Sequence, residues 1–272
     1  MSGNRRAIMT RKCFLVEPQV PGVEMVTLSD DVAHHLRNVL RLRPGDCIEL
    51  RDGRGNGWAA LVSEVKGKEV KIAVGEKLEV RNESPLELTL ALAFSRFERM
   101  ELVLRQATEM GVQRFIGFRA ERSDYHLLGP HVERRKERWL KIAREALCQC
   151  GRMRLPEIAV LSDSAELISG ADLWGSTEGR GIKILAREEG ERWGLRFLHL
   201  QYPACRRMLV VVGPEAGWSR REGEQFIQAG FHSVHLGPRT LRLETAAVSL
   251  LAAVQLLWGD LGTEEGCMGK ER

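Results

Sequence analysis

Two short loops in the C-terminal part of the chain carry residues whose side chains and backbone can act together in catalysis. The first, Gly213-Pro-Glu-Ala-Gly217, contains two glycines, where backbone can approach a ligand because no Cβ intervenes. In the second, Gly237-Pro-Arg-Thr-Leu-Arg-Leu-Glu-Thr245, Arg239 and Arg242 are three residues apart and Glu244 follows. The two guanidinium groups can stabilise an anion, and the carboxylate beside them can accept a proton. The pattern predicts an active site; a pair of tight turns that bind nothing is the alternative.

The elements around these loops indicate an α/β fold. Residues 209–212 are apolar and mostly β-branched, which is typical of a strand buried on both faces of a parallel sheet. Residues 234–236 are a second strand candidate, and Ser219 with Glu222 has the spacing of a capping box. A helix should begin there, with inward residues Phe226, Ile227 and Ala229. Because open α/β folds bind ligands at the carboxyl ends of their strands, we place the site within 209–258.

A long apolar helix is predicted at 246–258, capped by Glu244 or Thr245. It is apolar on nearly all sides, so most of its surface must be covered. It is too short, and too interrupted by Ser249 and Gln255, to favour a membrane span. Burial against its own sheet and a partner subunit would cover it; a central core helix in a monomer is the alternative.

The chain before the two loops predicts a division into two domains, 1–81 and 82–272. The first is expected to be a small, mostly antiparallel β-barrel with strands at 13–16, 47–51, 57–65 and 69–80 and one helix at 29–40. In the second, strands and helices alternate, which predicts a parallel sheet. Its strands are expected at 86–94, 112–118, 157–161 and 181–186, with helices from Phe97 to about Gly111 and at 131–150.

Composition narrows the functional classes only slightly. The 41 Lys and Arg residues against 37 Asp and Glu give a net charge of +4, which permits a nucleic-acid partner without demanding one. The six cysteines contain no Cys-x-x-Cys pair, so we expect reduced thiols and no metal site. No apolar run reaches the roughly 18 residues of a membrane helix, and no signal peptide is recognisable. We therefore expect a cytoplasmic protein that binds neither metal nor membrane.

Basic residues gather on two of the predicted helices. Arg37, on the helix at 29–40, and Arg41, directly after it, fall on one face, and the basic helix at 131–150 is followed by Arg152. Such faces suit contacts with phosphates, although a solvated helix face is the ordinary alternative.

Four further motifs follow one another along the chain: Glu109-Met-Gly-Val112, Glu121-Arg-Ser123, Gln149-Cys-Gly-Arg152 with Pro156, and Gly259-Asp-Leu261. Together with the two loops, they resemble the ribosomal RNA small subunit methyltransferase E family of the SPOUT superfamily, over about residues 11–262. Three positions depart from the family pattern. Ala216 stands for a usual Gly, Gln106 for a usual Lys and Cys148 for a common acidic residue, and these departures bear on RNA contacts more than on the cofactor.

The resemblance implies methylation of N3 of one uridine in 16S ribosomal RNA of the small ribosomal subunit, with S-adenosylmethionine as the methyl donor. It implies that 1–81 is a PUA-like RNA-binding domain and that 82–272 is a SPOUT domain with a C-terminal trefoil knot at about 209–258. It also implies a homodimer whose sites lie at the subunit interface, in a bacterial cytoplasm.

The implied site adds a third wall to the two loops, after the strand at 181–186. The expected cofactor contacts are Ala186, Arg187, Gly213, Pro214, Glu215, Gly217, Leu236, Gly237, Leu241, Arg242 and Thr245. The expected RNA contacts are Arg37, Arg41, Arg122 and Arg152. Because uridine N3 attacks only as the anion or while losing its proton, Arg239 and Arg242 are expected to stabilise the uridine anion. Glu244 is expected to accept the proton or to hold an arginine in place.

Two other functions fit parts of the sequence. A nucleotide-binding enzyme could use the Gly213 loop, although neither a Walker Lys-Ser/Thr nor Gly-x-Gly-x-x-Gly is present. A ribosome-assembly factor that binds RNA without catalysis would have a decayed site, marked by Ala216 and Gln106. Binding of S-adenosylmethionine separates these three readings.

If the helix at 29–40 contacts RNA, replacing both Arg37 and Arg41 by Glu should weaken RNA binding, because attraction to phosphate becomes repulsion. Cofactor binding should be unchanged. Filter binding and calorimetry measure the two affinities separately, and an unchanged RNA affinity at physiological salt would end the idea.

Overall fold

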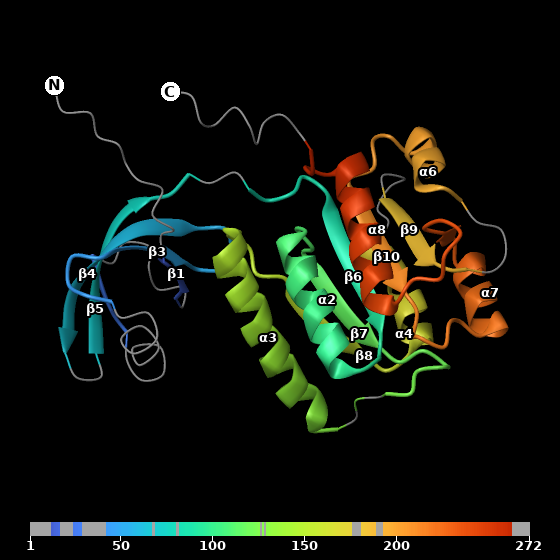
Figure 1. Cartoon of the computed structure of the whole chain (residues 1–272), viewed down its shortest axis with the longest axis horizontal. Coiled ribbons are helices and arrows are strands. Elements are labelled where there is room, and N and C mark those ends of the chain that lie inside the picture. The colour runs from blue at the N-terminus through green and yellow to red at the C-terminus, as the bar shows by residue number, and fades with distance from the viewer. Residues whose placement is uncertain are drawn as a thin grey trace. The chain divides into compact units, whose positions relative to one another are not determined.

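The structure is a computed structural model that divides into two compact units, one of residues 1–82 with 147–155 and one of residues 83–146 with 156–272 (Figure 1). It describes residues 12–16, 24–28, 42–66, 69–79, 82–125, 127, 129–175, 181–188 and 193–262. The predicted helix at 29–40, with Arg37 and Arg41, lies outside these residues. Each unit has its own sheet and is described by itself.

The small unit contains a five-stranded sheet in the order β1-β3-β4-β5-β2. Its strands are β1 (Lys12–Leu15), β2 (Met25–Leu28), β3 (Cys47–Arg51), β4 (Gly57–Lys66) and β5 (Glu69–Lys77). β1 pairs with β3 in parallel, and the other pairs are antiparallel. Alternate side chains face inward, as in Ile48 and Leu50, which are 1% and 0% exposed. The predicted strands are confirmed with small shifts in their ends, and β2 was not predicted.

Residues 147–155 return to the small unit after the middle of the chain. The buried Arg51 guanidinium donates hydrogen bonds to the carbonyls of Leu147 at 3.3 Å and Arg152 at 2.9 Å, and it pairs with Glu49 at 2.7 Å. The Leu155 amide donates to the Gly53 carbonyl at 2.8 Å. Arg51 therefore binds this segment to β3 by hydrogen bonds. No local pattern in the sequence predicts this contact.

The large unit contains a six-stranded sheet in the order β11-β9-β10-β6-β7-β8, and every pair is parallel. Its strands are β6 (Glu87–Ala93), β7 (Arg114–Phe118), β8 (Glu157–Leu161), β9 (Gly181–Ala186), β10 (Arg207–Val212) and β11 (His232–Val234). The predicted parallel sheet is confirmed. β10 is buried from Met208 to Val212, as its continuous apolar run predicts.

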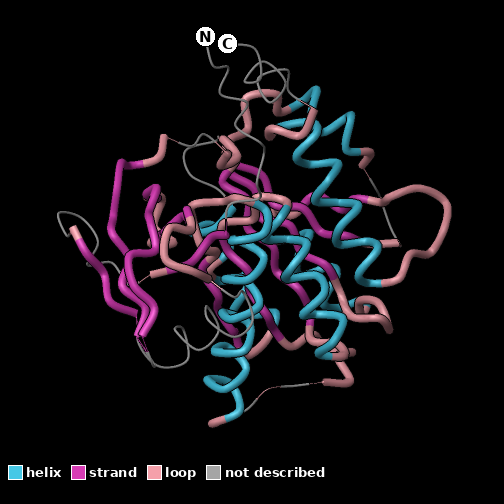
Figure 2. The backbone as a smooth tube through the Cα atoms, turned by 60° about the vertical axis from the view of Figure 1, so that its left-hand side comes forward, coloured by secondary structure: helices cyan, strands magenta, loops and turns pink. Residues whose placement is uncertain are grey.

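Helices cover both faces of this sheet (Figures 1 and 2). They are α2 (Phe97–Glu109), α3 (His131–Cys150), α4 (Ser164–Ser169), α5 (Ala171–Gly175), α6 (Leu195–Gln201), α7 (Arg220–Gln228) and α8 (Leu243–Trp258). On one face, α4, α5 and α7 bring Leu167, Ala171 and Phe226 into a cluster with side chains of β6, β7 and β10. Opposite it, α2 lies beside α8, and Trp139 of α3 meets Phe115 of β7.

α8 begins earlier than the sequence predicts. Its first residue is Leu243, and Arg242 stands at the cap position without a side-chain cap. The prediction that Glu244 or Thr245 caps the helix is therefore wrong, because both already lie in its first turn. A carboxylate there is still favourable, since the N-terminus of a helix carries partial positive charge. Among the described residues, no helix is long and apolar enough to cross a membrane.

α7 begins where its sequence predicts, but only half of the capping box forms. Ser219 Oγ accepts a hydrogen bond from the Glu222 amide at 3.0 Å. The Glu222 carboxylate instead accepts one from the Glu121 amide at 3.2 Å, in the loop after β7. Phe226 faces inward as predicted, whereas Ile227 is 42% exposed and was wrongly placed inside. Glu222 therefore connects the start of α7 to a neighbouring loop.

Burial makes Glu222 a source of pH-dependent stability. Its side chain is 0% exposed, and burial raises the pKa of its carboxyl above the ordinary value of 4.5. The folded protein then binds more protons than the unfolded chain between the ordinary and the raised pKa, so this group makes stability fall as pH rises through that window.

Glu222→Gln keeps an oxygen acceptor for the Glu121 amide and removes the charge. The variant should gain stability relative to the unsubstituted protein as pH rises from 5 to 8, because it lacks the loss of stability that deprotonation of Glu222 causes. Urea unfolding at both pH values measures the effect, with Glu224→Gln on the exposed side of α7 as the control. Equal slopes for the Glu222 variant and the unsubstituted protein would contradict the assignment.

Candidate functional site

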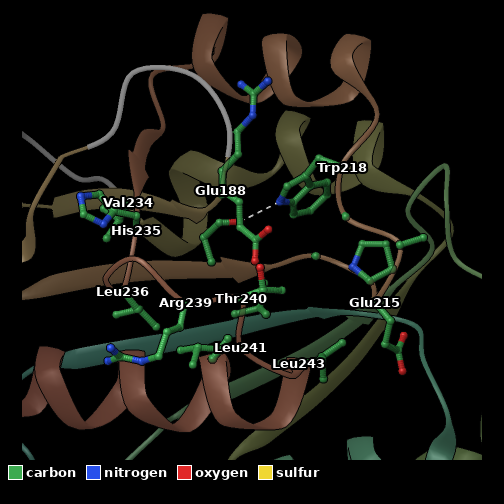
Figure 3. Close-up of a pocket in the computed structure, with 18 of the residues that line it drawn as sticks. Glu188, Glu215, Trp218, Val234, His235, Leu236, Arg239, Thr240, Leu241 and Leu243 are labelled. Carbon is green, nitrogen blue, oxygen red and sulfur yellow. Dashed lines mark hydrogen bonds between the residues drawn. The ribbon is translucent and has the colours of Figure 1, made fainter.

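A cavity of about 280 Å³ lies in the large unit where three loops meet, after β9, β10 and β11 (Figure 3). The parallel sheet brings the carboxyl ends of these strands to one edge. The cavity is lined by residues 122, 186–188, 212–218, 234–237, 239–241, 243 and 246. It occupies the part of the chain in which the sequence predicts the site.

The loop after β10 is shaped by its two glycines and by Trp218. Gly217 has φ +69° and donates to the Pro214 carbonyl at 2.9 Å, which closes a tight turn. A Cβ added to Gly213 would lie 2.7 Å from the Trp218 ring, so only glycine fits there. The indole Nε1 of Trp218 donates to the Ala186 carbonyl at 2.8 Å (Figure 3). This bond holds the first loop against the end of β9.

The loop after β9 supplies the third wall. The Arg187 amide donates to the Val234 carbonyl at 3.0 Å, which joins this loop to β11. The Arg187 guanidinium lies over Gly223 of α7, where an added Cβ would be 2.8 Å from its Cζ. Arg187 therefore lines the cavity and also packs on the helix that follows the first loop.

The loop after β11 gives the cavity its apolar side. Leu236, Leu241 and Leu243 line it, and Figure 3 shows Leu241 and Leu243 on the side next to α8. Gly237 has φ +104°, and an added Cβ would meet no atom within 4 Å, so its face is open. The Gly237 amide donates to His235 Nδ1 at 3.2 Å.

The cavity contains both signs of charge. The cations are Arg122, Arg187 and Arg239, and the carboxylates are Glu188 and Glu215. Arg122 lies in the loop after β7, and its guanidinium reaches the Ala216 carbonyl at 3.4 Å, a long hydrogen bond. Glu215 accepts a hydrogen bond from Arg99 of α2 at 3.1 Å. A ligand with separate cationic, polar and flat apolar parts would match this lining.

Most of the residues predicted for the cofactor line the cavity. These are Ala186, Arg187, Gly213, Pro214, Glu215, Gly217, Leu236, Gly237 and Leu241. Arg239, predicted to be catalytic, lines it as well. Arg122, predicted to contact RNA, lines it too. Four further lining residues, Glu188, Trp218, His235 and Thr240, were not predicted from the sequence, although each adjoins a predicted residue.

Arg242, Glu244 and Thr245 do not line the cavity. α8 begins at Leu243, and Leu243 and Ala246 line the cavity, whereas Arg242 stands at the cap position and Glu244 and Thr245 lie in the first turn outside the lining. Arg152 belongs to the small unit and is 3% exposed, which suits a structural role better than contact with RNA. The catalytic roles of Arg242 and Glu244, the cofactor contacts of Arg242 and Thr245, and the RNA contact of Arg152 stay predictions.

Comparison with known proteins places both units in families. Residues 82–255 match the model of an RNA methyltransferase domain, and residues 28–75 match that of an RNA methyltransferase PUA domain. The match at 28–75 confirms the PUA-like domain predicted from the sequence. Among the described residues, no group of three or more His, Cys, Asp or Glu side chains is placed to hold a metal ion.

Relatives match nearly the whole chain. Ribosomal RNA small subunit methyltransferase E of Synechocystis is 31% identical over 244 residues, covering 90% of this chain and 77% of that protein. The Bacillus subtilis protein of the same name is 27% identical over 254 residues, covering 90% and 97%. The crystal structure of ribosomal RNA small subunit methyltransferase E from Neisseria gonorrhoeae, bound to S-adenosylmethionine, superposes with a TM-score of 0.81 at 30% identity and covers 92% and 99%. These matches confirm the family that the motifs predict: the chain belongs to the ribosomal RNA small subunit methyltransferase E family.

Proposed function

We propose that this protein methylates N3 of a specific uridine in the 16S ribosomal RNA of the small ribosomal subunit, in the cytoplasm, with S-adenosylmethionine as the methyl donor. The observation that carries the proposal is the three-loop cavity within the part of the chain that matches an RNA methyltransferase domain. The Neisseria gonorrhoeae relative, of which 99% is covered, was crystallised with that cofactor.

The residues around the cavity fit S-adenosylmethionine. An added Cβ at Gly217 or Gly237 would meet no atom within 4 Å, so backbone there is open to a ligand. Leu236, Leu241 and Leu243 would pack on the adenine ring. The carboxylate of Glu188 would favour the positive charge of the cofactor or bond its hydroxyl groups. The bound cofactor supplies an electrophilic methyl group and a neutral leaving group.

The protein must then make uridine N3 a nucleophile, since the neutral base holds a proton there. A fixed cation close to the base stabilises the anion as it forms. Arg239 lines the cavity and is exposed, so it can reach a bound base, and Arg242 stands three residues further on at the exposed start of α8. We assign both to the uridine anion. Glu244 lies outside the lining and we assign it to holding an arginine, the second of its two predicted roles. The N3 proton then passes to solvent water, because a guanidinium is already protonated and cannot accept it.

RNA binding and assembly complete the proposal. The PUA-like unit and the exposed Arg122 at the cavity would contact RNA, whose target base must be unpaired or flipped to reach the cavity. Leu256 of α8 is 62% exposed and Leu200 of α6 is 74% exposed, and the two helices contact each other. Exposed apolar surface of this kind marks an association site, so we propose a homodimer through this face. A barrel in the small unit and a trefoil knot at about 209–258 belong to the same proposal.

Titration of S-adenosylmethionine by calorimetry tests the cofactor assignment, with ATP and GTP as controls. Saturable binding of S-adenosylmethionine alone is expected, followed by transfer of its labelled methyl group to 16S ribosomal RNA in reconstituted small subunits. Mass spectrometry of the digested RNA should identify 3-methyluridine. Binding of RNA without cofactor would indicate an assembly factor, and binding of ATP or GTP would indicate a nucleotide enzyme.

Arg242→Ala should lower turnover by about 10²–10³-fold, the usual loss when one group that stabilises an oxyanion-type charge is removed. Its affinity for S-adenosylmethionine should change little, because Arg242 does not line the cavity. Arg220→Ala is the matched control, since that exposed arginine of α7 pairs with Glu224 and also lies outside the lining. Equal losses of turnover and cofactor affinity in Arg242→Ala would show a binding role instead.

A further inference from the structure

One arginine of α2 lies close to two carboxylates from different parts of the chain, Glu215 in the cavity lining and Glu244 just outside it. A terminal guanidinium nitrogen of Arg99 lies 3.1 Å from Glu215 Oε1 and 4.0 Å from Glu244 Oε2. Glu215 belongs to the loop after β10, and Glu244 belongs to the first turn of α8. Figure 3 shows the Glu215 carboxylate pointing away from the middle of the cavity. The carboxylate of Glu215 therefore pairs with Arg99 within the protein, whereas the backbone of Glu215 forms part of the cavity wall.

The burial of these groups makes the contact more than a surface ion pair. The side chains of Arg99, Glu215 and Glu244 are 31%, 35% and 19% exposed. Oε2 of Glu244 is buried and makes no hydrogen bond within the described part of the chain. A charged oxygen in that position depends on a nearby cation. The planar guanidinium carries five donors, so a single group can serve both carboxylates.

The position of Arg99 gives this contact a consequence for the cavity. It lies in the first turn of α2, which follows the central strand β6 and packs against α8. The loop at 213–217 contains Glu215, and the loop at 236–242 leads directly into the turn that contains Glu244. Both loops are thus connected through one side chain to a rigid helix. Without that cation the two carboxylates, each within 4.0 Å of the same nitrogen, would repel each other.

We propose that Arg99 is a positioning residue that sets the two cofactor loops against each other, through Glu215 and Glu244. The effect of Arg99 on S-adenosylmethionine binding rests on the proposed function. Its effect on the two loops does not, because it is present in the protein without ligand. Arg99 does not line the cavity, so it acts on the loops and not on the substrate.

Arg99→Met removes the cation and keeps an apolar stem, and Arg99→Lys keeps a cation with a single donor group. Arg114→Met is the matched control, because Arg114 of β7 is 30% exposed and pairs with Glu157 at 2.8 Å away from the cavity. In the ligand-free protein, hydrogen exchange followed by mass spectrometry should show faster exchange over 213–218 and 236–246 in Arg99→Met. Arg114→Met should leave these segments unchanged, and Arg99→Lys should fall between.

Calorimetry then measures the consequence for the ligand. Arg99→Met should weaken S-adenosylmethionine binding by roughly tenfold, the loss expected with a hydrogen bond between charged groups that orders a binding loop. Arg99→Lys should recover part of it, and Arg114→Met should bind as the unsubstituted protein does. Unchanged exchange and affinity in Arg99→Met would overturn the role. Faster exchange in a protein that binds no S-adenosylmethionine would keep the loop-holding and remove the proposed function.

Discussion

The parallel pairing of β9 with both β10 and β11 is the constraint on which the site depends. Val212 and Val234, the last residues of β10 and β11, both stand opposite Ala186, the last residue of β9. Three loops therefore leave the sheet at the same level and on the same edge, so their side chains and backbone enclose one cavity. A slip in one pairing would move a whole loop along the sheet by about 3.3 Å per residue, which is enough to separate its walls.

Each wall of the cavity is then held by side-chain contacts that restrict which residue can stand beside them. Trp218 uses its indole nitrogen to hold the end of β9, and its ring occupies the space that a side chain at Gly213 would need. Arg187 occupies the corresponding space above Gly223. These glycines serve packing, whereas Gly217 and Gly237 have positive φ and open faces. The same residue type thus does two jobs: two glycines allow the loops to pack closely, and two leave backbone accessible to a ligand.

Local sequence patterns predicted the strands, helices and caps that depend only on residues near one another in the chain. The apolar run of β10, the helix of α3 and the Ser219 cap of α7 follow from periodicity and capping chemistry, and the lining of the cavity follows from the loops between such elements. The predicted start of α8 is wrong because Arg242 at the cap position makes no side-chain cap, whereas the oxygens of Glu244 and Thr245 can accept a hydrogen bond from a backbone amide. The return of 147–155 to Arg51, and the partners of Arg99, could not be predicted, since these contacts join residues far apart in the chain.

Charged residues that are close along the chain are also separated in space near the cavity. The sequence groups Arg239, Arg242 and Glu244 as one constellation, because they are close along the chain. In space, Arg239 lines the cavity, whereas Glu244 turns toward Arg99 on another helix. A carboxylate outside the lining cannot take a proton directly from a base bound inside it. A cation needs no such contact with the proton, because it favours the anion through its charge. For the proposed methylation, this arrangement favours activation of the uridine by Arg239 and Arg242, with Glu215 and Glu244 keeping the loops in place.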